Sequence, residues 1–300
     1  MSGQASSVGG AARTPGADPG ALRQVLVAID HSAASGIVVD RCARLPLAHH
    51  GVVTLVHVMR WGLGATSPMA YVALERSALA ALNQAAAQAL RVAVAAGAPA
   101  PRLETELLAG RPFLEIIQRA RARAVDLVVV GRHGHRTFLD ALIGSTTERV
   151  LRKGTTPVLI VAQEPRGPYR RALVAVDASE SCRRALDFAL RVLPADASVE
   201  VVHAWGQPDD EPRARATITE FLAGYGPRAA GWSVLLREGE PRAVILGEAR
   251  ARNTDLLVLG THGRSALHQM MVGSVAEAVA RGARCDVLVA RPGSHEYRSP

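Results

Sequence analysis

The sequence is poor in three kinds of residue that would point to particular functions. Aromatic residues make up 4% of the 300 residues, and Lys153 is the single lysine. The three cysteines, Cys42, Cys182 and Cys285, show neither paired spacing nor neighbouring histidines. This pattern argues against a disulfide framework or a zinc site, and we expect reduced thiols in a cytoplasmic protein. No apolar run reaches the roughly 20 residues that cross a bilayer, so we expect no membrane partner.

The charge balance is basic, with a formal net charge of +8 at pH 7 that is almost all arginine. A basic balance can indicate a nucleic-acid partner. The arginines, however, are spread along predicted helices, and no cluster of them alternates with aromatic residues that stack on bases. The pattern favours solvated helix faces, and we expect no nucleic-acid partner.

Aliphatic residues are abundant, and the predicted strands and helices alternate along the chain. Hydrophobic residues make up 48% of the sequence, which suits helices packed on buried parallel strands. The predicted strands cover residues 22–30, 52–58, 103–108, 127–130, 157–161, 171–177, 199–203 and 233–236. Helices are predicted from residue 32 to about 47 and over 71–95, 113–123 and 145–153. The alternation predicts an α/β fold with parallel strands and right-handed crossovers.

The series of strands and helices occurs twice. Asp30 ends the first predicted strand, and Asp177 ends its repeat. From Gly110 to the end of the fifth strand the two halves align without a gap, 129 residues apart. A duplicated domain explains this regularity. We predict domains over residues 21–163 and 169–292, with a linker at 164–168 and disordered tails at 1–20 and 293–300.

One stretch in each half has the layout of a phosphate-binding loop. In the first half a buried strand runs into Gly131-Arg-His-Gly134, and nine residues later Gly144-Ser145 opens a helix. Glycine lets backbone N–H groups approach a phosphate, and the free N–H groups of a helix N-terminus favour an anion. The second half repeats the spacing with Gly260, Gly263, Gly273 and Ser274. A single glycine pair is a common turn, but the whole spacing occurring twice predicts a phosphate cradle in each half.

Carboxylates are predicted at the strand ends opposite these loops. Asp30 and Asp177 follow the first strand of their halves, and open α/β sheets bind ligands at this edge where the strand order switches. Each carboxylate can accept a hydrogen bond from a ribose hydroxyl or an adenine amine. His57 and His203 lie in apolar strands, and we expect them to be core residues with satisfied hydrogen bonds. The combination of carboxylate and cradle predicts a nucleotide ligand.

The Gly-x2-Gly-x9-Gly-Ser spacing after a strand beginning Asp126-Leu resembles the ATP-binding motif of the universal stress proteins. The run from Val150 to Val161 resembles that family's last helix and strand. The resemblance covers almost the whole chain. It implies two tandem Rossmann-like domains of the adenine nucleotide alpha hydrolase-like type, each with a five-stranded parallel sheet. It also implies ATP as the ligand, with Mg²⁺ as a companion of the nucleotide.

The resemblance further implies which residues contact ATP. In the first half they are Ala28, Asp30, Val58, Val130, Gly131, His133, Gly134, Gly144, Ser145 and Thr146. In the second half they are Ala175, Asp177, Ala204, Leu259, Gly260, His262, Gly263, Gly273, Ser274 and Val275. Thr146 replaces a valine that the family often has after Gly-Ser, whereas Val275 keeps it. The second motif is therefore the closer match to the family.

Three functions are compatible with these features. The resemblance implies a stress-response regulator in which ATP occupancy changes domain or dimer geometry, and so the binding of a regulatory protein partner. A slow ATPase is the second hypothesis, although no G-x-x-x-x-G-K-[ST] loop occurs and no catalytic base is identified. The third is a nucleotide-independent interaction protein of the same fold, against which the two intact motifs argue. The resemblance also implies that the last strands, 158–161 and 287–289, pair the two halves, and it leaves a homodimer open.

Overall fold

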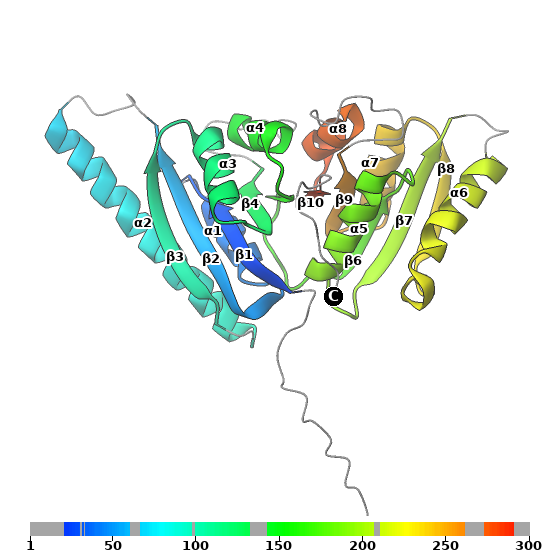
Figure 1. The fold of residues 1–300 in the computed structure, drawn as a ribbon, viewed down its shortest axis with the longest axis horizontal. Coiled ribbons are helices and arrows are strands. Elements are labelled where there is room, and N and C mark those ends of the chain that lie inside the picture. Colours follow the sequence, from blue (N-terminus) through cyan, green and yellow to red (C-terminus); the bar gives the residue numbers. More distant parts are fainter. Residues whose placement is uncertain are drawn as a thin grey trace, which may run out of the picture.

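The computed structural model describes residues 21–30, 32, 34–60, 67–97, 100–132, 143–206, 211–261 and 273–290. Within these ranges the two halves follow the same order of strands and helices (Figure 1). The first half contains β1 (Leu22–Ala28), α1 (Ala34–Cys42), β2 (Leu47–Met59), α2 (Pro68–Ala95), β3 (Arg102–Ala109), α3 (Pro112–Ala122), β4 (Leu127–Gly131), α4 (Ser145–Lys153) and β5 (Val158–Val161). The second contains β6 (Arg171–Ala175), α5 (Glu180–Val192), β7 (Ser198–Trp205), α6 (Glu211–Ala223), η2 (Gly226–Ala229), β8 (Ser233–Glu238), α7 (Pro241–Ala251), β9 (Leu256–Gly260), α8 (Ser274–Gly282) and β10 (Asp286–Ala290).

The strands of the described ranges form one sheet in the order β3-β2-β1-β4-β5-β10-β9-β6-β7-β8. Strands are parallel within each half, and the halves meet where β5 and β10 pair antiparallel, with Leu159 opposite Leu288. The predicted five-stranded parallel sheet of each half is confirmed. Pairing of the halves through their last strands is confirmed as well. The two sheets are therefore one continuous sheet with a seam at its centre.

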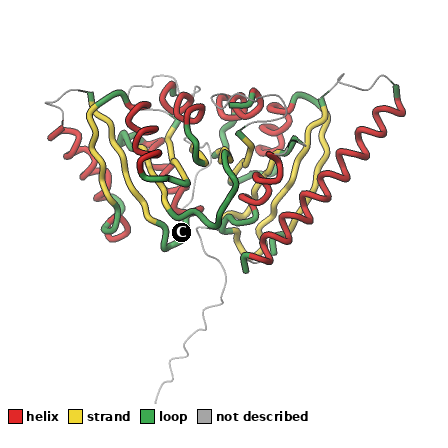
Figure 2. Tube along the Cα trace, turned by 180° about the vertical axis from the view of Figure 1, so that it is seen from behind, coloured by secondary structure: helices red, strands yellow, loops and turns green. Residues whose placement is uncertain are grey.

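Helices cover both faces of this sheet, and each layer packs into an apolar core that runs across both halves. One core includes residues of α1, α2, α5 and α6, such as Val38, Leu82, Leu186 and Ile218. The other includes residues of α3, α4, α7 and α8. From behind, the long helix α2 is seen along the outer side of its half (Figure 2). Both apolar cores therefore continue across the seam between the two halves.

A buried polar cluster crosses the seam. Asp286 is fully buried and accepts hydrogen bonds from Arg41 Nε and from the Tyr169 hydroxyl, each at 2.8 Å. Arg41 also donates to the carbonyl of Gly167 at 2.9 Å, and its guanidinium lies 4.0 Å from the centre of the Tyr169 ring. Burial raises the pKa of the Asp286 carboxyl, and the positive charge of Arg41 opposes that rise. The repeat did not predict this cluster, because Pro157 occupies the matching position in the first half.

Two predicted boundaries near the first helix were wrong. The helix expected to reach about residue 47 ends at Cys42, and β2 already begins at Leu47. The amides of Arg44 and Leu45 close a turn on the carbonyls of Arg41 and Cys42. Pro46 follows and has no N–H to continue a helix, so the chain turns directly into the strand.

Helix α2 begins before its predicted start at about residue 71. Ser67 is its N-cap, and the Ser67 hydroxyl accepts a hydrogen bond from the Ala70 amide at 3.2 Å. Pro68 occupies the first turn, where its missing N–H costs nothing. The added first turn is exposed, with Met69 85% accessible to solvent.

The three cysteines are buried free thiols. Burial raises the pKa of Cys42, Cys182 and Cys285 to about 12 in each case. They are therefore protonated at neutral pH and are poor nucleophiles. Among the helices in the described ranges, none is both long enough and apolar enough to cross a bilayer.

Candidate functional site

The strand order switches between β1 and β4, which are neighbours in the first half. Ala28, at the end of β1, is in register with Val130 of β4. The chain leaves β1 toward α1 on one face of the sheet and leaves β4 toward α4 on the other. The diverging connections open a crevice at the carboxyl edge of the sheet, where ligands of such folds bind.

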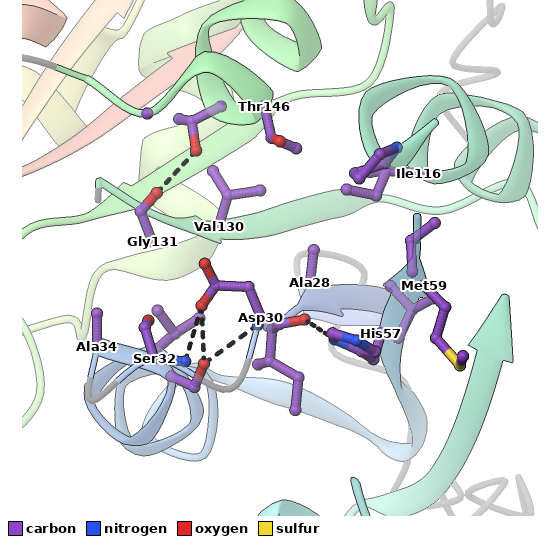
Figure 3. Close-up of a pocket in the computed structure, with 18 of the residues that line it drawn as sticks. Ala28, Asp30, Ser32, Ala34, His57, Met59, Ile116, Val130, Gly131 and Thr146 are labelled. Atoms are coloured by element: carbon purple, nitrogen blue, oxygen red, sulfur yellow. Dashed lines mark hydrogen bonds between the residues drawn. The ribbon is translucent and has the colours of Figure 1, made fainter. Parts of the chain in front are cut away.

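A pocket of about 490 Å³ lies in this crevice. Its lining comes from the ends of β1, β2 and β4 and from the helices around them (Figure 3). Eight of the residues predicted for the first site line it: Ala28, Asp30, Val58, Val130, Gly131, Gly144, Ser145 and Thr146. The other two predicted residues, His133 and Gly134, lie outside the described residues.

Asp30 is held in place by the turn that follows β1. Its Oδ1 accepts hydrogen bonds from the Ser32 amide at 3.1 Å and from the Ser35 hydroxyl at 3.4 Å. The Asp30 amide in turn donates to Ser35 Oγ at 3.2 Å. Figure 3 shows these bonds and the Asp30 side chain at the pocket wall between Ser32 and Gly131. The site therefore presents a carboxylate whose orientation is fixed before any ligand arrives.

The opposite wall is the N-terminus of α4. Gly144 is the N-cap of this helix, and its amide donates to the Arg132 carbonyl at 2.7 Å. The Thr147 hydroxyl donates to the Gly131 carbonyl at 2.7 Å, which ties the first turn of the helix to the end of β4. The first N–H groups of a helix have no acceptor within the helix, and with the helix dipole they attract an anion. Ser145 and Thr146 line the pocket at this point and add hydroxyl donors.

Several lining residues were not among those predicted from the sequence. His57 lines the pocket, although its Nδ1 donates to the Ile29 carbonyl at 2.9 Å, as expected of a core residue with a satisfied hydrogen bond. Met59 and Arg60 extend this wall beyond Val58. From the neighbouring helices come Leu74, Ser77 and Ala78 of α2 and Pro112 and Ile116 of α3. The three α2 residues lie within the helix predicted over 71–95, but the sequence pattern did not place that helix beside the pocket.

The second half places its predicted residues in the same pattern. Ala175 and Leu259 are paired in the neighbouring strands β6 and β9, and Ala204 lies near the end of β7. Asp177 Oδ1 accepts from the Ser179 amide at 3.0 Å, as Asp30 does from Ser32. The Gly273 amide donates to the Thr261 carbonyl at 2.6 Å, and Gly273, Ser274 and Val275 begin α8. His262 and Gly263 lie outside the described residues.

Helix α5 lies directly against Gly260 in this second site. A Cβ atom placed on Gly260 would lie 2.6 Å from Ser181 Oγ and 2.7 Å from the Cys182 amide nitrogen. Both values are far shorter than a van der Waals contact. In the first half the position of Ser181 is taken by Ala34, which lines the pocket. The serine therefore adds a hydroxyl at a point where the first half has only a methyl group.

The described residues hold no cluster of three or more histidine, cysteine, aspartate or glutamate side chains that could bind a metal ion. The titratable side chains that line the pocket are Asp30, His57 and Arg60. Of these, Asp30 is engaged by two serines and His57 by a backbone carbonyl. The lining thus provides a fixed carboxylate and a helix N-terminus across a partly apolar cavity.

Two segments of the chain, residues 21–162 and 168–291, match the universal stress protein family. A universal stress protein of Mycolicibacterium smegmatis is 28% identical over 293 residues, which cover 89% of this chain and 97% of the relative. One from Mycobacterium tuberculosis strain H37Rv is 30% identical over 184 residues, covering 55% of this chain and 61% of the relative. The crystal structure of a universal stress protein from Archaeoglobus fulgidus has a TM-score of 0.71 at 22% identity, over 90% of this chain and 98% of that one. This last likeness shows the shared fold.

Proposed function

Since the chain belongs to the universal stress protein family, we propose that it binds ATP in the first-half pocket and acts as a nucleotide-dependent regulator of a stress response. The observation that carries the proposal is the position of Asp30 and the α4 N-terminus on opposite walls of one cavity. A nucleotide carries groups that suit both walls. Its ribose hydroxyls can donate hydrogen bonds to a carboxylate, and its phosphates carry the negative charge that a helix N-terminus attracts.

The size of the cavity supports a ligand of this class. Pockets that bury small molecules and cofactors measure roughly 300–1,000 Å³, and this one measures about 490 Å³. In the proposed pose the ribose hydroxyls donate to Asp30, and the phosphates lie at Gly131, Gly144 and Ser145. The apolar side chains of Val58 and Val130 flank the adenine. Mg²⁺ would arrive with the triphosphate, and the proposal assigns it no protein ligand.

The residues that line the pocket favour a regulator that binds ATP without hydrolysing it. Hydrolysis needs a base that can activate water, and Asp30 and His57 both have hydrogen-bond partners within the fold. No catalytic residue is assigned. A slow ATPase stays as the second hypothesis, to be separated by the phosphate released in a long incubation with Mg²⁺ and ATP. The regulatory protein partner and the cytoplasmic location stay predictions.

Calorimetric titration of the purified chain with ATP, ADP and cyclic AMP tests the proposal. We expect saturable binding of ATP, weaker binding of ADP because it lacks one phosphate at the α4 N-terminus, and competition between the two. Asp30→Asn should weaken ATP binding about tenfold, the equivalent of one charge-assisted hydrogen bond of roughly 1.4 kcal/mol. Asp177→Asn is the matched control in the other half. Failure of the wild-type chain to bind ATP at millimolar concentration would contradict the proposal.

A further inference from the structure

Arg132 follows the glycine that ends β4, and its backbone fixes the point where the phosphate loop leaves the sheet. Its amide donates to the Val161 carbonyl of β5 at 2.8 Å. Its carbonyl accepts from the Gly144 amide at 2.7 Å, which is the N-cap of α4. Arg132 therefore joins the end of β4 to the beginning of the helix that forms one wall of the pocket.

The side chain of Arg132 points away from its own half and into the second one. It is buried, and its guanidinium donates from Nη1 to the Ala283 carbonyl and from Nη2 to the Arg281 carbonyl, the latter at 2.5 Å. Both carbonyls belong to the C-terminal end of α8. The last carbonyls of a helix lack partners within the helix and carry partial negative charge, so a cation is well placed there.

The matching position in the second half carries a different kind of side chain. The residue that matches Arg132 is Thr261, which is buried, and its carbonyl accepts from the Gly273 amide as Arg132 does from Gly144. A threonine side chain is too short to span the distance that a guanidinium covers. The backbone role is thus shared by both halves, while the long guanidinium side chain stands at this position in the first half only.

A second set of contacts joins the same two helices. Arg281 of α8 donates to Glu148 of α4 at 2.9 Å, and Arg152 of α4 donates to Glu277 of α8 at 3.2 Å. These pairs are partly exposed, so each contributes little on its own. Together, the two pairs connect α4 to α8 along the seam. The Arg132 guanidinium thus contacts the end of a helix that other side chains also connect to α4.

We infer that Arg132 is a positioning residue for the first nucleotide site, and that through it α8 of the second half holds the phosphate end of that site in its binding geometry. The inference rests on the proposed function. Because coupling between two sites is reciprocal, nucleotide binding must in turn stabilise the Arg132 contact with the α8 C-terminus. The second half then contributes to the first site without touching the ligand.

The test compares ATP affinity and backbone hydrogen exchange in the full chain and three variants. Arg132→Gln removes the charge and leaves one donor nitrogen in place of the two that contact α8, and we expect it to weaken ATP binding about tenfold, within the usual range of coupling between sites. Arg132→Lys keeps the charge and should restore about half of that loss on a logarithmic scale. Arg152→Gln cuts the exposed α4–α8 pair instead and should change affinity by less than about twofold.

Hydrogen exchange separates positioning from a merely structural role. ATP should slow exchange of the Ala283 amide, which donates to Val279 at the end of α8, in the wild-type chain but not in Arg132→Gln. Equal ATP affinity of Arg132→Gln and wild type would overturn the inference, as would exchange in α8 that ATP leaves unchanged. If the glutamine variant fails to fold, the lysine variant carries the comparison.

Failure of the proposed function gives a different result. A wild-type chain that binds no ATP contradicts that function directly. The Arg132 contact is then tested by α8 exchange without nucleotide, which should be faster in Arg132→Gln than in wild type. Unchanged exchange in that comparison overturns the contact as well.

Discussion

The two halves share a fold but differ at the seam between them. The stretch from Asp30 to Arg44 aligns without a gap with Asp177 to Arg191, yet Arg41 is matched by Phe188. Asp286 is likewise matched by Pro157, so each member of the buried ion pair occurs in one half only. Two identical halves would have to bury either two such pairs or none. The comparison shows that the duplicated sequence kept its sheet and diverged where the copies meet.

The same divergence separates the two candidate sites. The family resemblance predicts that the second-half motif is the closer match, whereas a pocket of about 490 Å³ lies in the first half. Its helix α2 runs from Pro68 to Ala95 and lends Leu74, Ser77 and Ala78 to the lining, whereas α6 of the second half spans only Glu211–Ala223. The similarity of a glycine motif to the family therefore describes only the loop. The pocket also depends on helices elsewhere in the chain.

Removing the carboxylate at the seam should have the largest effect. Asp286→Ala leaves the Arg41 guanidinium buried without its partner, and we expect a loss of roughly 3–5 kcal/mol in the free energy of unfolding. Urea denaturation measures it. Asp196→Ala is the control, since it breaks an exposed pair with Arg170 and should cost less than about 1 kcal/mol. Equal losses in the two variants would show that the seam is not held by the buried pair.

Filling one pocket at a time sharpens the comparison of the sites. Ala28→Leu places three more carbon atoms at the wall of the first-half pocket, and we expect ATP affinity to fall about 100-fold, or roughly 2.7 kcal/mol. Ala175→Leu makes the matched change in the second half and should alter affinity far less. Titration calorimetry measures both, with circular dichroism to verify folding. The reverse order of effects would move the main site to the second half.

Gly260 tests the close packing that is seen in the second half. Gly260→Ala would drive a methyl group into the Cys182 amide nitrogen and Ser181 Oγ, so we expect a loss of roughly 1–3 kcal/mol in stability. Gly206→Ala is the matched control, because nothing lies within 4 Å of its Cβ position. Equal thermal midpoints for the two variants would mean that α5 yields without cost. A substitution at Gly260 is therefore a change to the fold as well as to the site.

The smallest effect concerns pH and the α4–α8 ion pairs. Partial burial works to raise the pKa of Glu277, but the hydrogen bond and charges of Arg281 and Arg152 outweigh it, so the pKa lies below its usual value of 4.5. A lowered pKa in the folded state adds stability that is present above pH 4.5 and is lost as the pH falls through the folded value. The stability gap between wild type and Glu277→Gln, about 0.5 kcal/mol at pH 7, should therefore shrink below pH 4.5. A stability difference that widens below pH 4.5 would contradict a lowered pKa of Glu277.

The sequence carried most of the fold because its regularities are local or repeated. Buried strands, the glycine spacing and the gap-free alignment placed Asp30, Gly131 and Ser145 at one edge of the sheet. The predicted first helix is too long because its apolar spacing continues toward Pro46. Proline has no backbone N–H to continue a helix, and the apolar spacing does not register this. Arg132 and Asp286 were missed because a single contact between the two halves leaves no periodic pattern in the sequence. A signal for Asp286 did exist, since a carboxylate replaces a proline beside an apolar strand.

Chemical-shift mapping of the isotope-labelled chain during an ATP titration tests the central claim most directly. The account predicts that the largest backbone shifts fall on Gly131, Gly144 and Ser145 of the first half, with smaller ones at Ala28 and Asp30. It also predicts shifts at the end of α8 around Ala283, transmitted by Arg132. Saturating ATP that leaves these amides unmoved, or that moves those of Gly260 and Ser274 instead, would contradict it.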